Sequence, residues 1–354
     1  MKKTFRQQQE EISKRILQEA ERSTYFAKHF KKYTRQRTRI MEAMNTDSYG
    51  QVMRDCFAGE GPACGSIFCD KCLDKRQRSI TATYLNYFDE ELETDEGLAR
   101  NRFRWITVLH SLVKVNVRTS VDEQDTIDAC VAAANNLKKQ LRNLSRGADG
   151  IWLRGAIHVE LIDYSLFEYF VITGKGTAKE RTLSAFIEAN QMKWDAGAFD
   201  NNDKQLCFLI HFHALADIGD YSDDDFRKLF LKRWKLTHRQ VDISRLWKEI
   251  DTKQGTIKHR IEDALKGTAR YCYSRSNARL DFSRNWGAGE VVHTTGERRD
   301  TKGAVYAYAD AMKDRNLDED SSLSVGEVRL LVKVHNAIGG DAHEGLNVSI
   351  HRKR

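Results

Sequence analysis

The sequence contains a single proline, Pro62, among 354 residues, beside 22 glycines. Collagen-like sequences and proline-rich linkers are therefore excluded, and Gly, Asn and Asp must form most of the turns. No stretch approaches the roughly 18 consecutive apolar residues of a membrane-spanning helix, and MKKTFRQQQEEISKR at the start lacks the apolar core of a signal peptide. The sequence predicts a protein that makes no membrane contact and is located in the cytoplasm.

Charged and apolar residues are both plentiful. The chain has 58 Lys plus Arg against 51 Asp plus Glu, a net charge of +7, and 40% of its residues are hydrophobic. This composition excludes a wholly disordered chain and allows one large or two medium cores. Residues 1–50 carry 12 basic against 6 acidic residues, interleaved with aromatics. That pattern is typical either of a solvated helix face or of a segment that contacts nucleic-acid phosphates.

Four of the seven cysteines lie within one short stretch, as Cys56-x7-Cys64-x4-Cys69-x2-Cys72. In a reducing compartment such clustering favours a metal over disulfides, and four thiolates suffice for a tetrahedral structural zinc site. The alternative is a set of four reduced, buried cysteines. If zinc binds, residues 75–84 are expected to form a basic helix that leaves the site. Its candidates for DNA contact are Lys75, Arg76 and Arg78.

Hydrophobic periodicity predicts an alternating series of elements after the cysteines. Strands are expected at 102–110, 151–163, 204–218 and 239–247, and helices at 122–146, after the N-cap Ser222, and at 255–275. This order predicts an α+β fold with a ferredoxin-like antiparallel sheet and helices on one face. The predicted organisation is a basic helical region at 1–50, a cysteine region at 51–100, the sheet domain at 101–282 and an extension of unassigned role at 283–354.

Two histidines are the first candidates for chemistry. Alternation along the third strand places His211 and His213 on one face, and Glu160 lies on the polar face of the preceding strand. Two imidazoles and a carboxylate leave open positions on a divalent ion such as Mg²⁺ or Mn²⁺. His158 shares the face of Glu160 and is the substitute ligand. The alternative is a pair of ordinary packing histidines.

The last predicted helix contains two tyrosines, either of which is a candidate nucleophile or a packing residue. Tyr271 and Arg275 are four residues apart and share a face, where the cation would lower the phenol pKa and hold a phosphate. Tyr273 points about 200° away from Tyr271 on a straight helix, so only one of them can face a metal. The absence of a cation beside Tyr273 favours Tyr271.

Taken together, these motifs resemble those of the HUH endonuclease superfamily and, within it, the rolling-circle plasmid replication initiator (Rep) family. The similar motifs are Trp105-Ile106-Thr107-Val108, His211-Phe212-His213 and a helix tyrosine followed by a basic residue. The cysteine cluster, the stretch from Arg154-Gly155 to Glu160, and a tryptophan helix followed by Val-Asp-Ile are also similar. The resemblance covers roughly residues 50–282 and implies that 101–282 is an HUH nicking domain.

The resemblance implies site-specific nicking of a plasmid origin. In that family a divalent ion held by the histidines polarises the scissile phosphate of single-stranded origin DNA. The tyrosine then attacks to form a 5′-phosphotyrosine and a free 3′-OH primer. The implied partners are this DNA and the host helicase, single-strand-binding protein and polymerase. The chain departs from the family at Phe212, where proline is common, at Ser274, where lysine is common, and at Gly267, where a subgroup has a glutamate used in termination.

Two other interpretations remain open. An HUH transposase or mobilisation relaxase uses the same chemistry on a different DNA. A zinc-containing DNA-binding regulator has no catalytic activity, and its histidines and tyrosines are ordinary packing residues.

Overall fold

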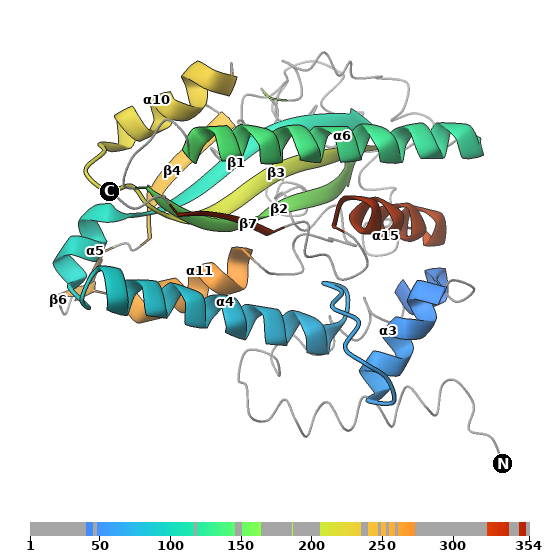
Figure 1. Cartoon of the computed structure of the whole chain (residues 1–354), viewed down its shortest axis with the longest axis horizontal. Helices are drawn as coiled ribbons and strands as arrows, with labels where there is room; N and C mark the ends of the chain where they lie inside the picture. Colours follow the sequence, from blue (N-terminus) through green and yellow to red (C-terminus); the bar gives the residue numbers. More distant parts are fainter. Residues whose placement is uncertain are drawn as a thin grey trace, which may run out of the picture.

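The apolar and alternating stretches form one five-stranded antiparallel sheet in the computed structural model (Figure 1). Its order is β4-β1-β3-β2-β7. The strands are β1 (Phe103–Lys114), β2 (Trp152–Asp163), β3 (Leu206–Asp217), β4 (Val241–Arg245) and β7 (Asn347–His351). The structure describes residues 40–44, 48–116, 119–145, 151–163, 186, 206–234, 240–246, 249–252, 255–258, 261–272, 324–339 and 347–351.

Two long helices connect the first four strands. Helix α6 (Ser120–Ser145) lies between β1 and β2, and α10 (Asp223–Trp234) lies between β3 and β4. The hydroxyl of Ser222 accepts a hydrogen bond of 3.1 Å from the Asp225 N–H and so caps α10 as predicted. The order of these six elements and the α+β class are confirmed, and the strand order β4-β1-β3-β2 is that of a split βαβ arrangement.

Helices cover both faces of the sheet, so the prediction of helices on one face is wrong. Figure 1 shows α6 and α10 on one side and α4 (Asp70–Glu91), α5 (Glu96–Arg102) and α11 (Ile261–Cys272) on the other. Every β3 residue after Leu206 is buried, so neither face of this strand is left to water. On the second face Tyr84 and Phe88 of α4 share a core with Leu265 of α11.

The C-terminal segment contributes to the same sheet and core. Helix α15 (Val325–Gly339) packs against α6, and β7 pairs with β2 at the sheet edge. The ring of His335 on α15 is buried and hydrogen-bonds the Val159 carbonyl at 2.9 Å. The described parts of residues 283–354, expected to be an extension, therefore complete the sheet domain.

Other elements refine the predicted boundaries. Residues 255–258, expected to begin the last helix, instead form β6 (Gly255–Lys258), which pairs with β5 (Glu249–Thr252) in a hairpin, and α11 starts after it. Helix α3 (Ser48–Ala58) precedes α4 in the cysteine region. Residues 1–39 of the basic region lie outside the described residues. Among the described helices, none is long and apolar enough to cross a membrane.

Candidate metal centres and active site

The four clustered cysteines converge between α3 and the start of α4. Cys56 lies near the end of α3, Cys64 lies in the following loop, and Cys69 and Cys72 lie at the beginning of α4. The Sγ of Cys56 is 3.9 Å from that of Cys69 and 3.6 Å from that of Cys72, and Cys64 Sγ is 3.7 Å from Cys72 Sγ. A tetrahedral zinc with Zn–S bonds of about 2.3 Å sets its sulfur atoms about 3.8 Å apart. The cluster thus has the dimensions needed to bind a metal such as zinc.

Hydrogen bonds give the thiols of this cluster different pKa values. Thiol donors at Cys64 and Cys69, together with the Gly65 N–H at 3.3 Å, lower the pKa of Cys72 far below its usual range. The neighbouring sulfur atoms of Cys56 and Cys64 raise the pKa of Cys69. A metal ion bound by all four thiolates would displace the remaining protons and satisfy the sulfur atoms together.

The three cations proposed to contact DNA differ in their environment on α4. Lys75 and Arg78 are exposed. Arg78 forms an ion pair with Asp74 one turn earlier. Arg76 instead donates a hydrogen bond of 3.2 Å to the Gly65 carbonyl. Arg76 therefore braces the loop that carries Cys64, whereas Lys75 and Arg78 face solvent.

Three histidines meet on the face of the sheet covered by α4 and α11. The strand register pairs His158 of β2 with His211 of β3, and Ala156 of β2 with His213 of β3. One ring nitrogen from each histidine lies within 4.8 Å of the other two, and all three rings are buried. The sheet therefore brings together both predicted histidines and the substitute candidate His158.

Strand β1 orients His213 from the other side. The hydroxyl of Thr107 is 2.8 Å from His213 Nδ1, and the Trp105 ring stacks on the imidazole with centroids 5.3 Å apart and planes inclined by 17°. A hydrogen bond to one ring nitrogen fixes the orientation of the other, so His213 Nε2 is directed to the cluster. Neither the Thr107 contact nor the tryptophan stacking was predicted from sequence, although both residues lie in the Trp105–Val108 motif.

His158 links the cluster to the last turn of α11. Its Nε2 is 2.9 Å from the Cys272 carbonyl oxygen. Because a carbonyl only accepts, Nε2 must carry the proton, and Nδ1 of the neutral ring is left as the nitrogen that could bind a metal. The alternation of β2 gave no indication of this contact, which depends on the packing of α11 against the sheet.

Glu160 lies on β2, two residues beyond His158. It pairs in register with Leu209, and its Oε1 is 3.9 Å from His211 Nε2. The carboxylate is buried, at 3% exposure, so it is held close to His211 away from bulk solvent. His158 is thus one of the three clustered residues, and Glu160 lies beside the cluster. Direct metal ligation by Glu160 stays a prediction.

Tyr271 is the penultimate residue of α11, directly before the Cys272 carbonyl that accepts from His158. A second contact holds this turn from the side of α4. The buried hydroxyl of Tyr84 donates to the Arg154 carbonyl at 2.9 Å and lies 3.6 Å from Cys272 Sγ. The backbone of the predicted nucleophile is therefore fixed next to the histidines. Tyr273 and Arg275 lie outside the described residues.

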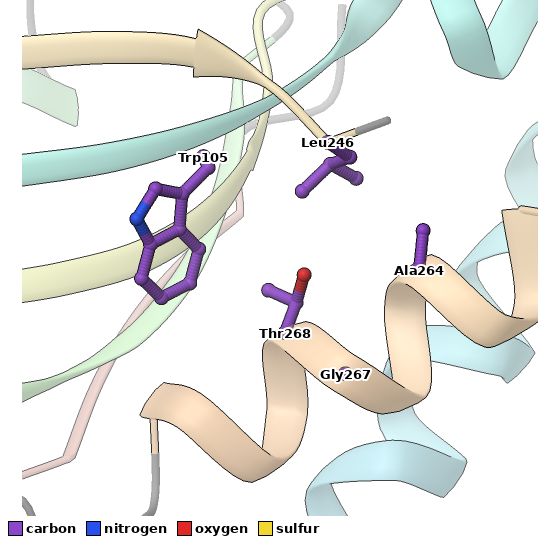
Figure 2. A pocket seen from close by; sticks show the side chains of 5 residues that line it. All are labelled: Trp105, Leu246, Ala264, Gly267 and Thr268. Atoms are coloured by element: carbon purple, nitrogen blue, oxygen red, sulfur yellow. The ribbon is translucent and has the colours of Figure 1, made fainter. Parts of the chain in front are cut away.

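A pocket of about 310 Å³ adjoins the cluster, between the sheet and α11 (Figure 2). It is lined by Trp105, Leu246, Ala264, Gly267 and Thr268. Trp105 belongs both to this pocket and to the stacked pair with His213. The Trp105 ring therefore lies between the pocket and His213 and is shared by both.

Three buried imidazoles with a flanking carboxylate form a donor set suited to a transition-metal ion. Comparison of the chain with family models, curated proteins and solved structures finds no match. The residues of the site and the order of their motifs are thus the basis for assigning a function.

Proposed function

We propose that this protein is a metal-dependent DNA endonuclease that nicks one strand of a plasmid origin and initiates rolling-circle replication. The hydrogen bond between His158 and the Cys272 carbonyl carries the proposal. It links the segment that contains the proposed nucleophile, Tyr271, to the proposed metal ligands. A cluster of packing histidines has no need of an adjoining tyrosine segment, whereas metal-assisted attack by a tyrosine requires one.

The proposed ion would be held by His158, His211 and His213, with Glu160 beside His211. Mg²⁺ prefers oxygen ligands and near-ideal octahedral geometry, whereas imidazole nitrogen suits ions of the first transition series. We therefore favour Mn²⁺ over Mg²⁺. When bound, such an ion would withdraw charge from the phosphoryl oxygens of the scissile group.

In the proposed reaction the phenolic oxygen of Tyr271 attacks phosphorus after losing its proton to solvent. A bond forms between phosphorus and the tyrosine oxygen, and the bond from phosphorus to the 3′ oxygen breaks. The leaving oxygen takes up a proton and becomes the 3′-OH that primes synthesis. Because one phosphoester replaces another, the reverse step can rejoin strands. Arg275 would hold the phosphate and favour the phenolate.

The cysteine cluster has a supporting role in this proposal. A structural zinc would fix the start of α4, from which Lys75 and Arg78 would contact duplex phosphates around the origin. The 3′-OH would then be used by host polymerase, with a host helicase and single-strand-binding protein acting on the displaced strand. Transposase and relaxase activities share this chemistry and differ in the DNA that is cleaved.

The test is relaxation of a supercoiled plasmid that carries the cognate origin, with Mn²⁺ or Mg²⁺ added to the zinc-loaded protein. We expect His211→Ala and His213→Ala to abolish nicking while the circular dichroism spectrum and DNA binding are retained. His110→Ala is the matched control, since His110 lies on β1 and hydrogen-bonds Gln140 outside the cluster. This control should nick at the wild-type rate.

Nicking by both cluster variants at the wild-type rate would show that the histidines are not catalytic. Wild-type protein that binds the origin but never relaxes it with either ion would instead support a zinc-containing DNA-binding regulator.

A further inference from the structure

We infer that the pocket between Trp105 and α11 binds one unpaired nucleobase of the DNA strand whose phosphate lies at the histidines. This inference rests on the proposed function and adds a subsite to it. The pocket is lined by the indole of β1, by Leu246, and by three small residues of α11, namely Ala264, Gly267 and Thr268 (Figure 2).

The walls of the pocket match a flat, uncharged group. Its volume of about 310 Å³ is at the lower end of the range for small-molecule sites. None of its five lining residues carries a charge, so the pocket offers no positive charge to a phosphate. A nucleobase can stack on an aromatic ring, and such stacking tolerates any base because every base has a π-face. The Thr268 hydroxyl can donate to or accept from the edge of a base.

The residues of α11 keep this space open. Ala264, Gly267 and Thr268 are three and four residues apart, so they share the helix face directed at Trp105. Gly267 is exposed, and no heavy atom of the described residues lies within 4 Å of the position that its Cβ would take. A larger residue at 267 would extend into the pocket without displacing backbone.

The pocket also lies next to the proposed site of strand cleavage. Trp105, which would contact the base, stacks on His213 with its ring planes inclined by 17°. Thr268 lies one helical turn before Cys272, whose carbonyl accepts from His158. A base held against Trp105 would therefore place its own backbone phosphate beside the histidines. The pocket would select which phosphate is presented to Tyr271.

Gly267→Leu is the variant that tests the pocket. Leucine favours helix more than glycine does, so the variant should fold while its side chain fills the pocket. Gly326→Leu on α15 is the matched control. That glycine is exposed and helical, and a Cβ added to it would also have no heavy atom of the described residues within 4 Å.

The measurement compares the affinity of each protein for a short oligothymidylate and for an abasic strand of the same length and charge, without added Mn²⁺ or Mg²⁺. We expect wild type and Gly326→Leu to prefer oligothymidylate by about fivefold or more, the contribution of one stacked base. Gly267→Leu should lose this preference, and its affinity for the abasic strand should be unchanged because the phosphate contacts remain.

An undiminished preference in Gly267→Leu, or no preference in wild type, would overturn the inference. Neither result depends on cleavage. Wild type that forms a covalent adduct without a base preference would refute the pocket alone. Wild type whose base preference is lost in Gly267→Leu, but which forms no adduct with any divalent ion, would refute the nuclease alone.

Discussion

Replacing Cys69 by serine should remove the metal from the cysteine cluster and destabilise the region that α3 and α4 form. Cys69 is fully buried at the N-cap of α4, with its sulfur 3.9 Å from that of Cys56. Structural zinc contributes about 10–16 kcal/mol in four-ligand zinc-finger peptides, so an equal share is roughly 2.5–4 kcal/mol for each ligand. Serine is slightly smaller than cysteine, so the cavity it leaves adds little to this loss.

Cys130→Ser provides the control for burying a hydroxyl in place of a thiol. Cys130 is fully buried on α6 and lies outside the cluster, and burial raises the pKa of its thiol to about 12. Placing a hydroxyl there without a hydrogen-bond partner is expected to cost about 1–3 kcal/mol. This variant should be destabilised but should retain its zinc.

Elemental analysis after dialysis and urea unfolding measure the two effects separately. We expect about one zinc per chain in wild type and Cys130→Ser, and none in Cys69→Ser. A chelator should lower the unfolding midpoint of wild type and leave that of Cys69→Ser unchanged. Wild-type protein that is fully folded without zinc, or Cys69→Ser that binds zinc with unchanged stability, would refute the assignment of a structural metal.

Two further predictions concern the contacts around α4. Tyr84→Phe removes the hydroxyl that donates to the Arg154 carbonyl, which should lower the free energy of unfolding by about 1–2 kcal/mol; an unchanged urea midpoint would contradict this. Burial and the carboxylate of Asp217 raise the pKa of Tyr87 above its ordinary value of 10.0. The unfolded chain therefore loses the phenolic proton at a lower pH than the folded protein does. The contribution of Tyr87 to the free energy of unfolding should be fully present below about pH 10 and should fall as the pH rises, by less than about 1.4 kcal/mol per pH unit because the ring is partly exposed. In urea unfolding, the stability of Tyr87→Phe should therefore fall less steeply with pH than that of wild type.

The sequence alone was sufficient for the local features of the fold. The three- and four-residue spacing of apolar residues predicted α6, and alternation predicted β2. The long apolar run predicted β3, and the acidic turn after Ser222 predicted α10. These patterns depend on residues close together in the chain. The clustering of Cys56, Cys64, Cys69 and Cys72 was evident for the same reason.

Features that depend on distant packing were not predictable. Alternation placed His158 and Glu160 on one face, but only the register of β2 against β3 determines which of them lies opposite His211. The side chains on both faces of β3 are mostly apolar and require a second layer of helices, yet no local pattern identifies α4 and α11 as that layer. Strand β7 is five residues long and pairs with a strand almost 200 residues earlier, so its period-two signal was too short to identify.

The central claim, that the last turn of α11 carries a nucleophile, is tested most directly by mapping the covalent protein–DNA adduct. The zinc-loaded protein is incubated with Mn²⁺ and an origin oligonucleotide labelled on the 3′ side of the nick, and digested peptides are identified by mass. We predict that the label is on Tyr271, that Tyr271→Phe forms no adduct and that Tyr273→Phe forms it normally. Label on Tyr273, or no adduct from wild-type protein with an oligonucleotide that it binds, would contradict the account.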